Sequence, residues 1–333
     1  MPLLLHESDV RELLTMQMAL SAVEESFERL GDGTGIVQPR RRLHVPDGSY
    51  LHYMAAADVR RSYMGMKIYT SAREGLRFIV PLFNAVTGEL LALIEADYLG
   101  QMRTGAASGV ATRLMARPDA SKIGLIGTGL QARTQLQAIA LVRKIDRVRA
   151  FGRDAARREK FAKDAAELLK IAVEPVGSAA EAVAGADIVV TATTASRPVV
   201  TGSMLQPGMH INAIGANFPE KRELDDDAVL RSNVVAVDLL EQAKIEAGDL
   251  IQTYAKDPER WKSVLELSDI AVGRKTGRSS SGQITLFKSS GIAIEDVTTA
   301  ACVYETAIEK GIGRQIPMWE SGGPSNRRSS RPR

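Results

Sequence analysis

Apolar residues near the start of the chain recur every three or four positions, at Met16, Ala19, Leu20, Val23, Phe27 and Leu30. This period predicts an amphipathic helix that ends at the run Gly31-Asp32-Gly33. The pattern then changes to short aliphatic and aromatic segments around residues 49–57, 63–70, 78–86 and 90–95, before residues 98–116 become helical again. The turn-forming run Thr87-Gly88-Glu89 predicts a hairpin between the last two segments. This part of the chain is therefore expected to be an α+β unit with an antiparallel sheet.

From residue 121 onward, strand-like and helical patterns alternate. Strands are predicted at residues 122–126, 147–151, 187–193, 210–214 and 234–238, with helices at 130–142 and 155–169. Such alternation is typical of βαβ units around a parallel sheet. A polar stretch over 273–282 leads to a strand at 284–287 and a helix at 293–310, which we expect to pack back on the first unit.

Length and charge refine this picture. A chain of 333 residues is long enough for about two domains, and 44% hydrophobic with 25% charged residues excludes wholesale disorder. The net charge is +3, but the last thirteen residues hold four arginines and no acidic residue. Without them the chain has 39 basic and 40 acidic residues, which argues against a nucleic-acid groove on the folded body. Residues 321–333 are expected to be a disordered basic tail.

Several other classes of protein are disfavoured. The single cysteine, Cys302, excludes an intrachain disulfide, and its apolar neighbours predict a buried, inert thiol. The four histidines have no metal-binding spacing, so we expect no metal site. No apolar run approaches the roughly 20 residues of a membrane span, and the N-terminus does not resemble a secretory signal. We therefore expect a soluble cytoplasmic protein that contacts neither membrane nor nucleic acid.

A glycine-rich turn after the strand at 122–126 is the sharpest motif. Gly127-Thr128-Gly129-Leu130-Gln131-Ala132 has the pattern G-x-G-x-x-A and opens a helix. Gly127 permits a tight turn, Gly129 lets the backbone approach a pyrophosphate, and Ala132 keeps helix and strand close. The N–H groups at the start of the helix would face the phosphates. In this setting the motif predicts a dinucleotide-binding site.

The end of the following strand bears on which dinucleotide binds. NAD sites usually have an acidic residue there that holds the ribose hydroxyls. Here Gly152 occupies that position and Arg153 follows, and a guanidinium suits a 2′-phosphate. We expect NADP(H) as the preferred cofactor and NAD(H) as the alternative. If Arg153 is only a solvated surface charge, Asp154 is left to bind the ribose.

Lys67 is unusual because it lies on an apolar strand beside Met66 and Ile68. Partial burial would lower the pKa of this lysine and make it a proton donor or acceptor near neutral pH. The alternative is a lysine at a strand edge whose ammonium group extends to water.

Taken together, these and other segments resemble the ornithine cyclodeaminase/μ-crystallin family, which includes archaeal-type alanine dehydrogenase and ketimine reductases. The resemblance covers about residues 10–315 and is carried by Gly65-Met66-Lys67, Thr87-Gly88-Glu89, Arg103-Thr104-Gly105, the glycine-rich turn, Pro207-Gly208-Met209 and Lys288-Ser289-Ser290-Gly291. It implies an α/β fold with two domains. Residues 119–296 would form a Rossmann dinucleotide-binding domain, and residues 1–118 with 297–320 an α+β substrate and dimerisation domain.

The resemblance also implies roles for individual residues in a cleft between the domains. Lys67 would face the nicotinamide and act in catalysis and substrate binding, while Arg103 would bind the substrate carboxylate and contact the cofactor. Arg41, within a run of three arginines, best matches a second carboxylate-binding arginine. Further cofactor contacts are expected from residues near the ends of later strands, namely Thr193, Ser196, Ile214, Ser290 and Gly291.

Asn217 is the informative departure from the family pattern. Cyclodeaminases and alanine dehydrogenases of the family have a proton-handling aspartate at this position. An amide cannot accept a proton at any useful pH, although it can hydrogen-bond an imine or amine. We therefore predict an NAD(P)H-dependent reductase of cyclic 2-imino acids, in which Asn217 orients the imine nitrogen.

Three alternatives remain open. The first is ornithine cyclodeaminase, the second an alanine or other amino-acid dehydrogenase, and the third a non-catalytic NADPH-binding protein like some μ-crystallins. The sequence does not identify the side chain of the substrate. The family resemblance also implies a homodimer that pairs the sheets of the first domain.

Overall fold

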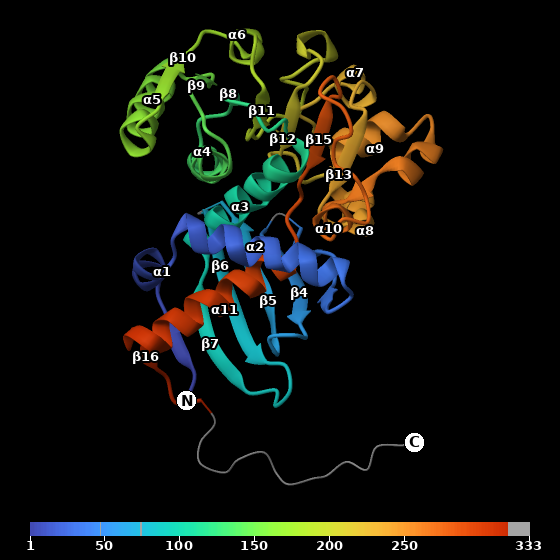
Figure 1. The fold of residues 1–333 in the computed structure, drawn as a ribbon. Helices are drawn as coiled ribbons and strands as arrows, with labels where there is room; N and C mark the ends of the chain where they lie inside the picture. Colours follow the sequence, from blue (N-terminus) through green and yellow to red (C-terminus); the bar gives the residue numbers. More distant parts are fainter. Residues whose placement is uncertain (47, 74, 319–333) are drawn as a thin grey trace.

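Two sheets of eight strands each organise the computed structural model, which describes residues 1–46, 48–73 and 75–318 (Figure 1). The first sheet is mainly antiparallel and has the strand order β16-β1-β7-β6-β5-β4-β2, with β3 paired to β4. Its strands are β1 (Leu3–Leu5), β2 (Gly35–Val37), β3 (Arg41–His44), β4 (Tyr50–Asp58), β5 (Tyr63–Ala72), β6 (Gly75–Asn84), β7 (Leu90–Glu95) and β16 (Arg314–Gln315). The predicted antiparallel sheet is thus present, with additional short strands at its edges.

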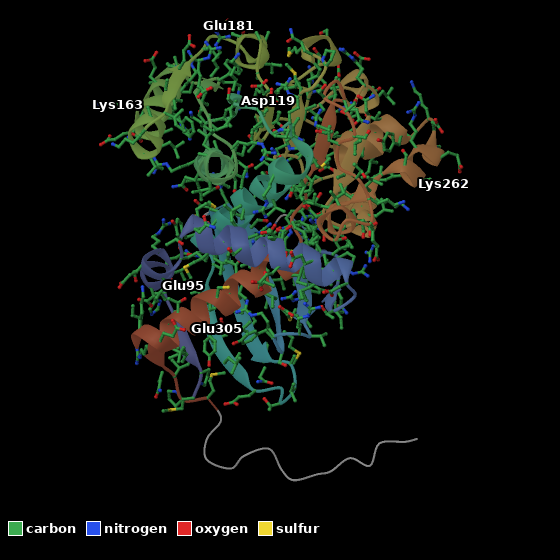
Figure 2. The ribbon with its side chains drawn as sticks, in the orientation of Figure 1. Glu95, Asp119, Lys163, Glu181, Lys262 and Glu305 are labelled. Atoms are coloured by element: carbon green, nitrogen blue, oxygen red, sulfur yellow. The ribbon has the colours of Figure 1, made fainter. Side chains whose placement is uncertain are left out.

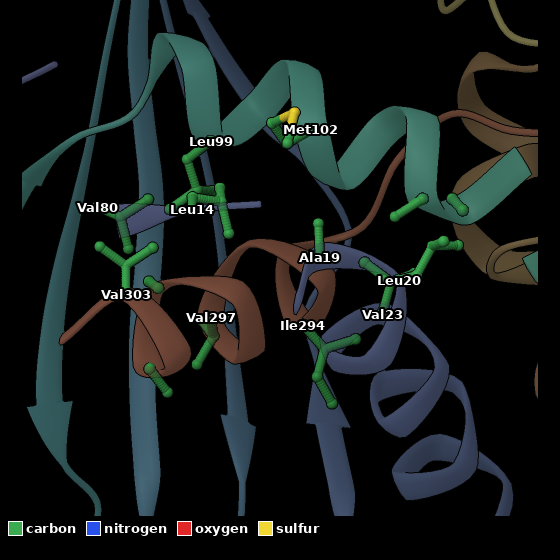
Figure 3. Packing of buried hydrophobic residues seen from close by; sticks show 14 of the residues in the cluster. Leu14, Ala19, Leu20, Val23, Val80, Leu99, Met102, Ile294, Val297 and Val303 are labelled. Carbon is green, nitrogen blue, oxygen red and sulfur yellow. The ribbon is translucent and has the colours of Figure 1, made fainter. Parts of the chain in front are cut away.

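Helices cover one face of this sheet. They are α1 (Glu7–Leu13), α2 (Met16–Gly31), α3 (Asp97–Met115) and α11 (Ala293–Lys310). Figure 3 shows Leu99 of α3 and Val303 of α11 beside Val80 of the sheet, and Val23 of α2 near Ile294 of α11 at the other end of the same core. Successive side chains on a strand point to opposite faces, so the residues between the buried ones face away from the helices.

The second sheet is entirely parallel, with the order β10-β9-β8-β11-β12-β15-β13-β14. Its strands are β8 (Lys122–Ile126), β9 (Arg147–Phe151), β10 (Ala172–Pro175), β11 (Ile188–Thr191), β12 (His210–Ala213), β13 (Val234–Val237), β14 (Leu265–Glu266) and β15 (Thr285–Lys288). The helices between them are α4 (Leu130–Val142), α5 (Ala155–Leu169), α6 (Ala179–Val183), α7 (Asp226–Leu230), α8 (Leu240–Glu246), α9 (Gly248–Tyr254) and α10 (Leu267–Ala271). The α/β fold class and the Rossmann-type sheet are therefore confirmed.

The packing of α3 on α4 joins the two halves. Gly105 of α3 is in such close contact that a Cβ atom there would lie 2.4 Å from the carbonyl oxygen of Thr134 on α4. Most residues of α3 are buried, and small residues such as Gly105 let two helices from different halves approach closely. This contact fixes the base of the space between the halves.

The chain returns to the first half earlier than the predicted boundary at residue 297. All of α11, from Ala293 onward, packs beside α2 and across β4 and β5 (Figure 1). Strand β16 then pairs with β1. The tail predicted to be disordered, residues 321–333, lies outside the described residues. Within the described ranges, no helix is both long and apolar enough to cross a membrane.

Candidate active site

A cavity of about 510 Å³ lies between the two halves, and we call it the interdomain cavity. The first half contributes residues from the inner face of β4–β6 and from α3. The second half contributes the glycine-rich turn after β8 and the segments after β11, β12 and β15. Its lining residues include Arg40, His52, Lys67, Tyr69, Phe78, Arg103, Gly129, Leu130, Gln131, Thr193, Ile214, Asn217, Ser290 and Gly291.

Lys67 extends from β5 into this cavity and is only 3% exposed. Its Nζ atom donates a hydrogen bond to Oδ1 of Asp296 at 2.9 Å and lies 5.1 Å from the ring centroid of Phe78. Burial, together with the charge of Arg103, lowers the pKa of Lys67 to about 8 although Asp296 opposes the shift. An amine with this pKa exchanges protons readily near neutral pH, which suits acid–base chemistry.

Arg103 reaches the same carboxylate from α3. Its Nε donates to Oδ1 of Asp296 at 3.0 Å, and its Nη1 donates to Oε2 of Glu295 at 2.8 Å. Asp296 therefore bridges the only lysine and one of the arginines that line the cavity among the described residues. The bridge holds two cationic groups side by side, as a site for an anionic substrate requires.

The second arginine of the cavity is Arg40, which corrects the prediction of Arg41. Arg41 is exposed and is absent from the described lining, whereas Arg40 is 6% exposed. The guanidinium of Arg40 pairs with Glu246 and donates to the carbonyl oxygens of Ser290 and Gly291 at 2.9 and 3.2 Å. Arg40 precedes β3, while Arg41 lies inside the strand opposite Tyr53, on the outward face of the sheet.

Asn217 lines the cavity from the segment after β12. Arg42 holds the backbone of this residue by donating to its carbonyl oxygen at 2.9 Å, and Arg42 also pairs with Glu246. Glu246 thereby links the arginine run to the loop that presents Asn217.

The glycine-rich turn has the geometry that a dinucleotide pyrophosphate requires. Gly127 has a φ of +107°, and a Cβ atom there would lie 2.3 Å from the carbonyl oxygen of Ala192. Above Gly129, no atom lies within 4 Å of an ideal Cβ position in the described structure. Gly129 caps α4 without a side-chain hydrogen bond, which leaves the first N–H groups of the helix for a ligand. The residues thus fit the diphosphate of a dinucleotide cofactor.

The remaining residues of this turn take different positions. Leu130 and Gln131 line the interdomain cavity, and Ala132 is fully buried against the sheet. Thr128 lies beside a second hollow, between α4 and α5, and packs against Gly152 so closely that a Cβ atom on Gly152 would be 2.4 Å from its Oγ1.

The end of β9 presents Arg153 to solvent, outside both hollows in the described structure. Asp154 is the N-cap of α5, and its carboxylate accepts a hydrogen bond from the backbone of Arg157 at 2.9 Å. One oxygen of the Asp154 carboxylate, which the alternative prediction assigned to the ribose, is therefore used to cap α5.

Thr193, Ile214, Ser290 and Gly291 line the interdomain cavity, whereas exposed Ser196 is not among its described lining residues. A buried network supports these segments. Glu223 accepts hydrogen bonds from the backbone and hydroxyl of Thr193, both at 2.7 Å, and from the backbone of Gly215 at 2.7 Å. Lys288 is fully buried and holds the carbonyl oxygen of Ala216 at 2.5 Å.

Sequence reasoning missed an aromatic stack that forms one wall of the cavity. The His52 ring lies parallel to Tyr69 at a centroid distance of 4.2 Å, and Tyr69 stacks on Phe78 at 4.9 Å. Burial lowers the pKa of His52 to about 4, so its imidazole is neutral at physiological pH. The register that sets His52 opposite Tyr69 and Tyr69 opposite Phe78 builds the stack, and alternating aromatic residues on adjacent strands were the available signal.

The model of the ornithine cyclodeaminase/mu-crystallin family matches residues 1–311. The chain belongs to this family. A Delta(1)-pyrroline-2-carboxylate reductase of Bacillus cereus is 39% identical over 261 residues, which cover 76% of this chain and 80% of that protein. The expected family membership is therefore confirmed.

Solved structures of family members have the same fold. The Thermococcus litoralis Delta(1)-pyrroline-2-carboxylate reductase, solved with NADH and L-proline, matches with a TM-score of 0.90 and 36% identity, over 94% of this chain and 100% of that one. An archaeal alanine dehydrogenase dimer with bound NAD has a TM-score of 0.90 and 34% identity, over 96% of this chain and 99% of that one. Both are nicotinamide-dependent enzymes by name or bound cofactor, so this family includes oxidoreductases of amino and imino acids.

Proposed function

We propose that the protein is an NAD(P)H-dependent reductase of cyclic 2-imino acids of the pyrroline- or piperideine-2-carboxylate type. The observation that carries this proposal is the group formed by Lys67, Asp296 and Arg103 in one cavity with the glycine-rich turn. The reductase names and the L-proline ligand of two related proteins support the same substrate class.

In this proposal the cations of the cavity bind and orient the substrate. Arg103 and Arg40 would bind the carboxylate, because a guanidinium can pair with it through two parallel hydrogen bonds. Lys67 would donate a proton to the imine nitrogen, and its pKa of about 8 keeps the donor protonated at neutral pH. A bound nicotinamide would supply the hydride to the imine carbon. Asn217 would accept or donate a hydrogen bond at the nitrogen without exchanging a proton.

Asn217 also favours reduction over cyclodeamination. Cyclodeamination oxidises an amine to an imine and then admits attack by a second amine, so protons are taken up and released several times. Reduction of a preformed cyclic imine needs one proton and one hydride. A single group of suitable pKa, Lys67, serves the second reaction, and a neutral amide at position 217 adds no further base.

A panel of substrates tests the proposal. We expect NADPH or NADH oxidation with Δ1-pyrroline-2-carboxylate and Δ1-piperideine-2-carboxylate, and little or no ammonia release from ornithine with NAD+. Asn217→Asp should raise any trace of cyclodeaminase activity, and Asn217→Ser is the matched uncharged control. Ammonia release from ornithine by the unmodified protein, with no net change of NAD(H), would establish the lyase instead. Tight NADPH binding without turnover of any imine would indicate a binding protein.

We further propose that NADP(H) is the preferred cofactor. The position after β9 that usually carries an acid is Gly152, and Asp154 is engaged as a helix cap. Arg153 is exposed beside them and would pair with a 2′-phosphate.

Finally, we propose a homodimer formed through the outer face of the first sheet. Tyr53, Ile68 and Ile79 lie opposite one another on adjacent strands, and Tyr53 and Ile79 are 39% and 44% exposed. A row of exposed apolar side chains on a sheet is typical of a buried protein interface. One family member is described as a dimer.

A further inference from the structure

The charged cluster around the cations of the interdomain cavity contains equal numbers of acidic and basic side chains, which is unexpected for a site that must bind an anion. The basic groups are Lys67, Arg40, Arg42 and Arg103, and the acidic groups that face them are Asp238, Glu246, Glu295 and Asp296. With all eight ionised, the cluster is neutral and a substrate carboxylate would give it a net negative charge. One additional proton would restore a favourable charge balance.

Buried carboxyl oxygens without partners indicate where that proton resides. Glu295 is fully buried; its Oε2 accepts from Arg103, while its Oε1 has no hydrogen-bond partner within the described residues. Asp238 is 2% exposed, and its Oδ1 likewise has no partner there. Oδ2 of Asp296 also has no partner there, but Oδ1 of Asp296 accepts from both Lys67 and Arg103, and these two cations favour the ionised form of Asp296. A buried, ionised oxygen without a donor is costly, and a proton on one of these carboxyl groups would lower that cost.

The hydrogen bonds of the two groups assign the proton to Glu295. Burial raises the pKa of Asp238, but its Oδ2 accepts from the backbone N–H groups of Ser290 and Gly291 at 2.6 and 2.8 Å, and these hydrogen bonds oppose the shift by favouring the ionised form. The carboxyl group of Glu295 accepts a hydrogen bond from Arg103 alone among the described residues.

The charged surroundings of Glu295 point the same way. Burial and repulsion by Asp238 raise the pKa of Glu295 to about 8, although Arg103 opposes the shift. The groups facing Glu295 come from three neighbouring elements: Arg103 on α3, Asp238 after β13 and Asp296 on α11 itself. Lys67 of β5 adds its charge to the group through Asp296.

We infer that Glu295 is protonated in the resting protein, so that its carboxyl group does not offset the positive charge of Arg103, which can then attract the carboxylate of the substrate. Glu295 is then a positioning residue. It does not touch the reacting atoms, but its protonation state determines the net charge beside Arg103, which binds the substrate carboxylate. Above about pH 8, Glu295 would lose its proton, and its negative charge would then offset the positive charge of Arg103 and weaken substrate binding. This inference rests on the proposed function for the identity of the anion.

Infrared spectroscopy of the protein without ligands tests the protonation directly. We expect the C=O stretching band of a protonated carboxylic acid at neutral pH, which disappears as the pH rises through about 8. Labelling glutamate with ¹³C should shift this band, which separates Glu295 from Asp238 without any substitution. Glu295→Gln should remove the band. The absence of a glutamate carboxylic-acid band in the unmodified protein would overturn the inference.

The pH dependence of ligand binding tests whether the protonation of Glu295 controls substrate binding. With NADH bound, log Kd for L-proline should rise with pH above about pH 8. The slope of this rise should be about one unit smaller in Glu295→Gln than in the unmodified protein, because binding to the variant no longer requires a proton at position 295. Glu305→Gln is the matched control: it lies ten residues further along α11, about 15 Å away, where it pairs with Arg61 (Figure 2). Equal slopes in the unmodified protein and in Glu295→Gln would overturn the inference.

Neither measurement requires turnover. If the protein reduces no imine but shows the band and the altered slope, only the proposed function fails. If it reduces imines without the band, only the assignment to Glu295 fails.

Discussion

At the scale of single residues, the pKa of Lys67 sets the direction of the pH dependence. Desolvation favours the neutral amine and Asp296 favours the ammonium ion, and the balance leaves the pKa at about 8 instead of the usual 10.5. The proton is therefore retained at neutral pH yet given up easily.

We predict opposite pH profiles for the two directions of the proposed reaction. Reduction needs the protonated Lys67, so its kcat at saturating substrate should fall as pH rises through about 8. Oxidation of the cyclic amino acid needs the neutral amine, so its kcat should rise over the same interval. Initial rates in both directions check this. Lys67→Ala should abolish reduction while NADPH binding, followed by fluorescence, is retained. Profiles that are flat around pH 8 would contradict the assignment.

A second prediction at this scale concerns Arg153. A charge-assisted contact with a 2′-phosphate contributes about 1.5 to 3 kcal/mol, or roughly one to two powers of ten in affinity. NADPH should therefore bind more tightly than NADH, and Arg153→Ala should remove most of that difference while NADH binding stays nearly unchanged. Arg147→Ala, at the other end of β9, is the control. Equal affinities in the unmodified protein would refute the preference.

At the scale of elements, a buried ion pair supports the segments that line the cavity. The Nζ atom of Lys288, on β15, lies 3.2 Å from Oδ2 of Asp249 on α9, and both side chains are fully buried. Oδ1 of Asp249 also accepts hydrogen bonds from the backbone N–H groups of Glu223 and Leu224 at 2.6 and 2.9 Å. The pair thus couples the last strand of the parallel sheet to the network that holds Thr193 and Gly215.

We predict that Lys288→Met destabilises the protein by about 3 to 5 kcal/mol, because Asp249 would keep a buried charge without its partner. Lys262→Met is the control, since Lys262 forms an exposed pair with Glu259 (Figure 2), and such pairs contribute about 0 to 1 kcal/mol. Urea denaturation measures both. Similar losses of unfolding free energy for the two variants would contradict the role of Lys288.

Elements with long, regular patterns could be predicted from the sequence, and short ones could not. The helices at 130–142, 155–169 and 293–310 begin and end as predicted, because each has several turns of consistent periodicity. Strands β2 and β3 have three and four residues, too few for a recognisable alternation.

The residues of the candidate site could also be predicted only in part, but for a different reason. Three consecutive arginines cannot be told apart in the sequence. The residue at which β3 begins determines that Arg40 is the one that faces the cavity. Glu295 and Asp296 lie in the first turn of α11, where acidic residues are common because they complement the helix dipole. Their sequence context therefore gives no sign of the contacts that they make with Lys67 and Arg103.

At the scale of the whole molecule, the outer face of the first sheet makes a prediction about assembly. Light scattering at micromolar concentration should give about twice the chain mass of 36.0 kDa. Ile79→Glu should shift the mass toward that of one chain, because burying an unpaired carboxylate in an apolar interface is unfavourable. Leu230→Glu, exposed on α7 in the other half, should leave it unchanged. A single-chain mass for the unmodified protein would contradict the homodimer.

The return of α11 to the first sheet has a consequence for synthesis on the ribosome. Strands β1 to β7 are complete once α3 has been made, but their main covering helix begins at Ala293, 178 residues after α3 ends at Met115. At a synthesis rate of about 5 to 20 residues per second, this interval lasts roughly 10 to 35 s. During this time, apolar side chains of the sheet such as Val80 and Leu82 are not yet covered by α11. Part of the apolar face of the first sheet is therefore uncovered until nearly the whole chain has been synthesised.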